Sequence, residues 1–454
     1  MINKRGVSMS TMLTSGIRQE VSVYMKEKQE ELVKGLQKLI QIPSETGYEG
    51  DVQEHIKTIM QGLGLDVETF VANAETVRKH PEYTESEVEK LVGFEGRPNV
   101  MGQWKGSEDA RSLLLFTHVD TVPVGDLVHW NYPPHEGVME NGLMYGRGTA
   151  DNKGGFGSIL AALEVIKGMG LKPKGTVTAI SVVDEEVGGA GGAVAMTQYL
   201  QKKNFHAEAC IYPHPLTTGA GPQIACAGGL IFKIKVKGVA AHNLNGQIGI
   251  NAIGKAMKIY DALVELDEQR VKTVSYPPFE RYFAASDMEV RSSNITPAII
   301  KAGEWAYKVP AECELTGTIG YPPNETLEEV KAQIEEAVNQ VASQDEWLLK
   351  NPPEITYEWH TNPAEISPDH PFVQLVKGNI DAVVGRTTEI FGMPTFSDIR
   401  FPLIYMDMPA IIYGPKGGNL HGADEWVNVQ DWLDCVESNV LNILEWCGYE
   451  EIGK

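Results

Sequence analysis

The chain has 454 residues, of which 42% are hydrophobic, and this length predicts two domains, with three as the alternative. Lysine and arginine total 39 against 61 aspartates and glutamates, and the resulting net charge of −22 argues against nucleic acids and anionic membranes as partners. The five cysteines are scattered and no apolar run is long enough for a signal peptide or a membrane span, so we expect reduced thiols in a cytoplasmic protein.

The N-terminal part of the chain is predicted to be helical. Residues 21–42 place leucines and an isoleucine on one helical face, and Pro43 stops this helix. A second amphipathic helix follows and ends at Gly64, a residue that favours helix C-termini. Residues 75–92 are rich in charged side chains, and we interpret them as a solvated helical insertion at the surface.

Short apolar strands then alternate with helices. The predicted strands are Leu113–Phe116, Val177–Val183 and Ala209–Tyr212, and helices are predicted over Gly155–Ile166 and Gly192–Gln201. This alternation predicts an α/β fold with a mixed, largely parallel sheet sandwiched by helices. Open sheets of this kind bind ligands beyond the C-terminal ends of their strands.

The hydrophobic pattern changes after residue 229. Residues 230–237 alternate apolar side chains with lysines, which is typical of a half-exposed antiparallel strand. A helix over 249–266, strands around 285–319 and a helix from Glu325 complete a small α+β unit. We therefore predict an inserted domain over residues 229–346.

The remaining residues would form one split catalytic domain. Residues 1–228 supply its first part, and residues 347–454 return to it through a predicted strand at Glu354–Trp359.

Five side chains of the types that bind zinc follow the predicted strands and loops: His118, Asp151, Glu186, His214 and His421. Imidazole and carboxylate together suit zinc, and a site with two metal ions can activate water at neutral pH. Asp120 stands two residues after His118, where its carboxylate could hold the ring in one tautomer.

Each of these signals is weak by itself. A histidine at a strand end is more often an ordinary hydrogen-bonded residue, and Asp151 could be a helix cap. Its glycine-rich loop is not a phosphate-binding loop, because Lys153 is followed by glycine instead of Ser or Thr.

Three acids, Asp184, Glu185 and Glu186, directly follow an apolar strand. A surface turn is the simple interpretation, but the placement also suits a metal ligand beside a general base. Adjacent acids repel one another, so we expect a positive group nearby.

The segments around His118, Asp151, Glu185-Glu186 and His421 resemble the family of zinc-dependent aminoacylases, acetylornithine deacetylase and succinyl-diaminopimelate desuccinylase, which also includes carboxypeptidases. The resemblance covers essentially the whole chain after residue 25. It implies that Asp151 bridges two divalent metal ions, that Glu186 and His421 complete one site and that His118 serves the other. The ions would be zinc, with manganese and cobalt as alternatives because they share these ligands.

The same resemblance implies roles for neighbouring residues. Glu185 would be the general base, Asp120 would orient His118, and the Asp151-Asn152 bond would be a cis peptide. In the inserted domain, the segment ending at His242 resembles a lid motif whose histidine reaches the partner subunit's active site and stabilises the developing oxyanion.

Asn294 resembles a lid asparagine that contacts substrate. The family resemblance therefore implies an inserted lid and dimerisation domain, and a homodimer formed through it.

Two positions depart from the family pattern. The family's fifth ligand is usually Glu or Asp before a proline, and His214 stands at that place in this chain. A related branch that hydrolyses carbamoyl amino acids uses histidine there, so we predict that His214 is a ligand. The alternative is that His214 is an ordinary loop histidine and that the second metal site is weakened. Gly320 stands where many members carry an arginine for the substrate carboxylate. The substrate then either lacks an α-carboxylate or is bound by another arginine, such as Arg291 or Arg400.

The leading hypothesis is a metal-dependent amidohydrolase. It would cleave a small N-acyl compound (acetyl, formyl, succinyl or similar) through a metal-bound hydroxide, with Glu185 as general base. A di- or aminopeptidase of the same fold is the alternative enzyme, and the absent lid arginine argues against a carboxypeptidase. A non-catalytic binding protein with this fold is the alternative from another class, but the presence of Glu185 argues against it.

Overall fold

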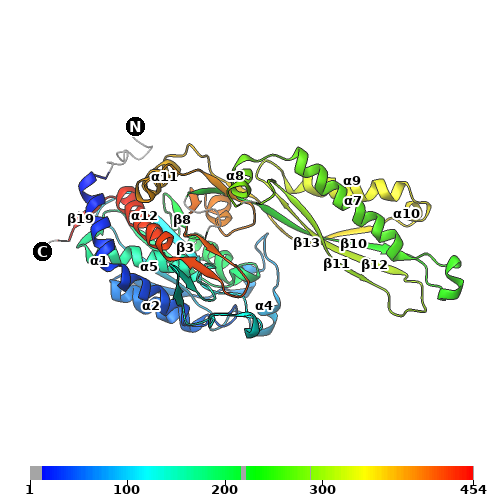
Figure 1. Cartoon of the computed structure of the whole chain (residues 1–454), viewed down its shortest axis with the longest axis horizontal. Helices are drawn as coiled ribbons and strands as arrows, with labels where there is room; N and C mark the ends of the chain where they lie inside the picture. The colour runs from blue at the N-terminus through cyan, green and yellow to red at the C-terminus, as the bar shows by residue number, and fades with distance from the viewer. Residues whose placement is uncertain (1–12, 216–220, 287, 453–454) are drawn as a thin grey trace. The chain divides into compact units, whose positions relative to one another are not determined.

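The computed structural model describes residues 13–215, 221–286 and 288–452 (Figure 1). The chain forms two compact units. The first comprises Met1–Ile224, Ile366–Ile390 and Asp398–Lys454, and the second comprises Ala225–Glu365 and Phe391–Ser397. The second unit thus extends to Glu365, whereas the predicted insertion ends at residue 346; the domain boundaries from the sequence stay a prediction.

The first unit is built on a mixed sheet in which the strands follow the order β1-β2-β7-β3-β8-β16-β9. Its strands are β1 (Asp66–Phe70), β2 (Asn99–Trp104), β3 (Leu113–His118), β7 (Val177–Val182), β8 (Cys210–Tyr212), β9 (Gln223–Cys226) and β16 (Ala410–Ile412). The central strands β7, β3, β8 and β16 are parallel, and the outer pairs are antiparallel. Every residue of β3 and β7 is buried, as expected for parallel strands covered on both faces. The predicted fold class is confirmed.

Long helices pack beside this sheet. They are α1 (Ser15–Ile40), α2 (Gly50–Leu63), α5 (Lys153–Gly168), α6 (Ala195–Lys202), α11 (Pro371–Val384) and α12 (Val429–Cys447). Helix α5 contacts β3, α1 and α12, and it is buried along almost its whole length (Figure 1). A Cβ on Gly157 would lie 3.1 Å from Leu36 Cδ1, so glycine at this position lets α1 approach α5 closely.

A small antiparallel sheet in the same unit has the order β17-β18-β5-β4. Its strands are β4 (Val138–Glu140), β5 (Leu143–Tyr145), β17 (Gly417–Gly418) and β18 (Trp426–Asn428). Tyr145 at the end of β5 pairs with Trp426 at the start of β18. The loop after β5 and the loop before β18 therefore lie side by side. A further two-stranded sheet joins β6 (Leu171–Pro173) to β19 (Tyr449–Glu451).

The charged segment 75–92 was predicted to be a solvated helical insertion, but it is helical only in part and is not solvated throughout. It contains two short helices, α3 (Ala74–Val77) and α4 (Glu87–Val92), and the side chain of Glu82, which lies between them, is buried. Glu82 accepts a 2.6 Å hydrogen bond from Nε of Arg400. A buried carboxylate needs a cationic partner, and this one lies 318 residues away, where local charge patterning cannot reveal it.

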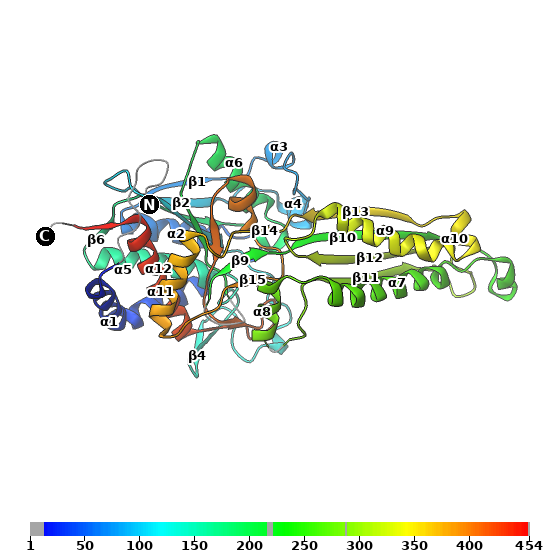
Figure 2. The same cartoon turned by 90° about the horizontal axis from the view of Figure 1, so that it is seen from above.

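The second unit contains a four-stranded antiparallel sheet in the order β11-β12-β10-β13 (Figure 2). Its strands are β10 (Gly228–Lys237), β11 (Asn294–Ala302), β12 (Glu312–Tyr321) and β13 (Glu354–Thr361), and its helices are α7 (Ala252–Thr273), α8 (Pro277–Ala285), α9 (Leu327–Ser343) and α10 (Glu346–Lys350). Alternate residues of β10, including Phe232 and Ile234, join α7 and α9 in one hydrophobic core. Lys235, the residue after Ile234, points away from this core and pairs with Glu312. The predicted alternation of buried and more exposed side chains along this strand is confirmed.

Candidate metal centre

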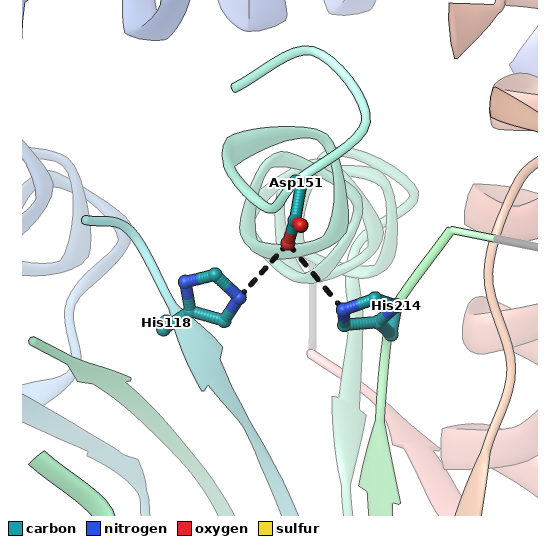
Figure 3. A group of neighbouring side chains, drawn as sticks. All are labelled: His118, Asp151 and His214. Carbon is teal, nitrogen blue, oxygen red and sulfur yellow. Dashed lines mark ion pairs between the residues drawn. The ribbon is translucent and has the colours of Figure 1, made fainter. Parts of the chain in front are cut away.

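The five predicted ligand residues meet around the carboxylate of Asp151. Its Oδ1 lies 3.1 Å from His118 Nε2 and 3.4 Å from His214 Nε2 (Figure 3). Its Oδ2 lies 3.3 Å from His421 Nε2, and that ring nitrogen is 3.0 Å from Glu186 Oε2. Two groups of three ligand-type residues therefore share Asp151, with one of its oxygens directed at each group.

Sheet topology brings three of these residues together. His118 is the last residue of β3, His214 follows β8 by two residues, and Glu186 lies in the short 3-10 helix η2 (Glu185–Val187) after β7. Because β7, β3 and β8 are adjacent and parallel, their carboxyl ends meet at one edge of the sheet.

Two loops beside the small sheet supply the other ligand-type residues. Asp151 lies in the loop between β5 and α5, and its bond to Asn152 is the cis peptide that the family resemblance implied. His421 lies between β17 and β18 with a φ of 61°, and its side chain is 59% exposed.

Asp120 connects two parts of the site. Its Oδ1 lies 3.4 Å from His118 Nδ1 and accepts a 3.2 Å hydrogen bond from the Glu185 amide. Its Oδ2 accepts hydrogen bonds from the Glu186 amide at 3.2 Å and from the Thr46 hydroxyl at 2.9 Å. The carboxylate of Asp120 thus contacts both a candidate ligand ring and the turn that carries the two glutamates.

Burial and proximity shift the ionisation of these groups. Burial raises the pKa of Glu186 to about 8 and also raises the pKa of Glu185. Burial opposes a positive charge on His118, but Glu185, Asp120 and Asp151 raise its pKa well above the usual range. Hydrogen bonds with Asp151 and Glu186 raise the pKa of His421 to about 10. So many buried carboxylates at close range favour positive charge at the centre of the site.

Atoms at the centre also lack conventional partners. Within the described part of the chain, His118 Nε2, Asp151 Oδ1 and Glu186 Oε1 are buried and have no hydrogen-bond partner. Unpaired buried polar atoms cost free energy unless a ligand satisfies them. Imidazole nitrogens and carboxylate oxygens in two groups of three fit two divalent metal ions, with zinc among the cations that prefer this donor set.

The positive group expected near the three adjacent acids is Arg97. Its Nη2 lies 2.5 Å from Asp184 Oδ1 and 2.6 Å from Glu49 Oε1, and all three side chains are buried. Asp184 has a φ of 70° and directly precedes Glu185. The sequence indicated the need for this cation but not its identity, because Arg97 is 87 residues from Asp184.

A second buried pair near the centre was missed in the sequence. Arg147 lies 2.6 Å from Glu425, and Glu425 accepts a hydrogen bond from the Asp151 amide. Only the position of Glu425 shortly after His421 hinted at a role in the site.

His242 and Asn294 lie in the second unit. His242 is exposed, and its Nδ1 accepts a 3.2 Å hydrogen bond from the Leu244 amide. Asn294 on β11 pairs with Gly320 on β12, and a Cβ on residue 320 would lie 2.6 Å from Asn294 Oδ1. Glycine at 320 therefore leaves room for the Asn294 side chain. The substrate roles of His242 and Asn294 stay predictions.

The two arginines suggested as replacements for a lid arginine already have acidic partners. Arg400 is buried and pairs with Glu82 and Asp398. Arg291 lies 3.5 Å from Asp267 and also pairs with Glu289. This arrangement favours the version of the hypothesis in which the substrate lacks an α-carboxylate.

Comparison with known proteins agrees with this geometry. The model of peptidase family M20/M25/M40 matches residues 114–443. An N-formyl-4-amino-5-aminomethyl-2-methylpyrimidine deformylase of Bacillus subtilis is 30% identical, over 79% of this chain and 85% of its own length. A deformylase of the same name from Halalkalibacterium halodurans is 27% identical, over 96% of this chain and 99% of its own length.

Solved structures share the fold. A tripeptidase from Staphylococcus aureus superposes with a TM-score of 0.69 at 19% identity, over 92% of this chain and 98% of its own. A di-peptidase from Saccharomyces cerevisiae reaches 0.71 at 14% identity, over 96% of this chain and 99% of its own.

Proposed function

The chain belongs to peptidase family M20/M25/M40, and from this premise we propose that it is a metal-dependent deformylase of a small N-formyl aminopyrimidine. The wider class is that of a metal-dependent hydrolase of linear amides in small N-acyl compounds. The observation that carries the proposal is the carboxylate of Asp151, which directs one oxygen at each of two ligand groups.

Two sets of residues would hold the metal ions. His118, Asp151 and His214 form one set, and Asp151, Glu186 and His421 form the other. We propose zinc in both, because nitrogen and oxygen donors of this kind suit it, while manganese and cobalt share the ligands. Bound ions would supply Lewis-acid activation of the amide carbonyl and of water.

Glu185 would perform the proton transfers. Its Oε2 lies 3.9 Å from His118 Nε2, beside the shared carboxylate. Burial raises its pKa, which makes the carboxylate a stronger base toward water. Glu185 takes a proton as the water oxygen attacks the formyl carbon, and it returns this proton to the amine nitrogen as the C–N bond breaks. The products are formate and the free amine.

Other residues would position these groups. Asp120 holds the amides of Glu185 and Glu186 through its two carboxylate oxygens. By family resemblance, we propose that His242 of a partner subunit stabilises the oxyanion and that Asn294 contacts substrate. The aminopyrimidine named for the curated relatives has no α-carboxylate. This agrees with glycine at position 320.

A panel of acylated amines tests the proposal. Release of the free amine would be measured with N-formyl, N-acetyl, N-succinyl and N-carbamoyl forms of one aminomethylpyrimidine and with dipeptides, and formate would also be measured for the formyl compound. We expect kcat/KM for the formyl compound to exceed that for the acetyl compound by about 10–200-fold, since a pocket fitted to hydrogen resists an added methyl group. Preferred cleavage of dipeptides would instead support the peptidase alternative.

We also propose a homodimer formed through the second unit. Strand β11 is at the edge of its sheet, and Ile299 and Ile300 on it are about half exposed. Trp305 is 65% exposed in the following turn. Exposed apolar edge strands favour pairing with another chain. Sedimentation is expected to show a dimer for the native chain and a monomer for Ile300→Lys, whereas a monomeric native chain would refute the proposal.

A cytoplasmic location is proposed from the thiols. All five cysteines are buried thiols, and none of them forms a disulfide. In the described part of the chain, no helix combines the length and the apolarity that membrane crossing requires. Cell fractionation checks this location, and recovery of the protein outside the cytoplasmic fraction would contradict it.

A further inference from the structure

A buried ion pair lies between the two loops that carry Asp151 and His421. Arg147 Nη1 is 2.6 Å from Glu425 Oε2, and the two side chains are 1% and 0% exposed. Neither residue belongs to the two ligand groups, and the proton transfers described above do not involve them. Burying two charges costs free energy that only good geometry and further hydrogen bonds repay, so the other contacts of the pair indicate its role.

Glu425 holds the backbone of the Asp151 loop. Its Oε1 accepts 2.9 Å hydrogen bonds from the amides of Ala150 and Asp151. Its carbonyl oxygen accepts a third, also 2.9 Å, from the amide of Gly146. One residue therefore fixes both ends of the loop that presents the shared carboxylate.

Arg147 holds the backbone of the His421 loop. Its Nη2 lies 3.4 Å from the carbonyl oxygen of His421 and 3.3 Å from that of Pro123. Its guanidinium also lies over the ring of Trp130, 5.3 Å from the ring centroid. The His421 side chain is 59% exposed, so packing does little to hold the ring, and the backbone contact gains importance.

The two ligand groups differ in their support. His118 and His214 lie at or just beyond the ends of the adjacent parallel strands β3 and β8, whose ladder hydrogen bonds set their separation. The 3.3 Å approach of Asp151 Oδ2 and His421 Nε2 joins two loops instead. The Asp151 loop begins after Tyr145 and the His421 loop ends before Trp426, and these two residues pair with each other; beyond them, the Arg147–Glu425 pair links the loops.

We propose that Arg147 and Glu425 are positioning residues that set the metal affinity of the Asp151/Glu186/His421 group. The inference rests on the proposed function, because it requires both groups to bind metal. Loss of the pair would let the His421 loop move away from the Asp151 loop and weaken that group most, because the other group shares Asp151 but keeps both of its histidines at or just beyond the ends of parallel strands. Residues that orient metal ligands in this way typically contribute a factor of about 10–100 to metal affinity.

The test is a metal titration of the full-length, metal-free protein. Zinc binding would be measured by calorimetry, and cobalt binding by the visible absorption spectrum, which reports ligand geometry. Arg147→Met is expected to weaken one of two binding steps by about 10–100-fold and to change the spectrum of one cobalt ion only. Arg147→Lys keeps the charge but lacks the planar fork that reaches several oxygens, so it should recover part of the loss.

Glu425→Gln covers the case in which Arg147→Met does not fold. Glutamine retains an oxygen for the amides of Ala150 and Asp151 but loses the charge that pairs with Arg147. The same binding step should weaken. Arg270→Met is the matched control, because Arg270 makes a similarly buried 2.6 Å pair with Glu325 in the second unit. Both binding steps should be unchanged in it.

The outcomes separate the inference from the proposed function. Equal weakening of both steps, or no weakening, in Arg147→Met and Glu425→Gln would overturn the positioning role. If the native protein itself binds fewer than two metal ions, the two-metal proposal fails, and the inference fails with it.

Discussion

Glu185→Gln is expected to lower kcat by about 10²–10⁴-fold, the usual contribution of a general acid–base group. Glutamine has nearly the same shape, and the backbone hydrogen bond from residue 185 to Asp120 does not depend on the side chain. The amide cannot accept a proton from water at neutral pH, so only the proton transfer is removed. Steady-state formate release by the metal-loaded variant measures the effect.

The neighbouring acid supplies the control for this experiment. Glu186→Gln alters a side chain 3.0 Å from His421, so it should lower metal content together with activity. Glu185→Gln should keep the native metal content. Activity of Glu185→Gln within a few-fold of native would exclude Glu185 as the base.

Asp151→Ala is expected to remove both metal ions and reduce activity to background. Each oxygen of this carboxylate is directed at a different ligand group, so its loss leaves two groups with two ligand residues each. His214→Ala removes a ligand from one group only and should leave one tightly bound ion per chain. Metal analysis after dialysis measures both ratios.

The two variants also test separate claims. An Asp151→Ala protein that retains one tightly bound ion would contradict the shared carboxylate. A His214→Ala protein with native stoichiometry and affinity would show that His214 is a loop histidine, although its Nε2 lies 3.4 Å from Asp151 Oδ1.

The substrate hypothesis changed most between sequence and structure. Gly320 in the sequence left two explanations open, a substrate without an α-carboxylate or a replacement arginine. The structure pairs Arg400 with Glu82 and Asp398, and Arg291 with Asp267. A guanidinium already matched to carboxylates would have to give up these ion pairs to bind a substrate carboxylate.

Much of the fold could be predicted from the sequence because its signals are local. The apolar run before His118 indicated a buried strand, and the lysine alternation in 230–237 indicated a strand with one exposed face. Gly64 adopts a left-handed conformation at the end of α2, as its position predicted. Candidate metal ligands could be named because their residue types are specific and follow predicted strands, where ligands of open α/β sheets bind.

Only the tertiary structure decided how these residues are held. Arg97 neutralises Asp184 across 87 residues, Glu82 pairs with Arg400 across 318, and Arg147 pairs with Glu425 across 278. Such pairs leave no periodic trace in the sequence, since neither partner constrains its own neighbours. Burial explains these pairs, because a charged side chain removed from water needs an oppositely charged partner. Packing of the folded chain decides which distant residue lies close enough to be that partner. The sequence by itself therefore determined which side chains are candidate metal ligands, and packing decided which oxygen of Asp151 faces which group.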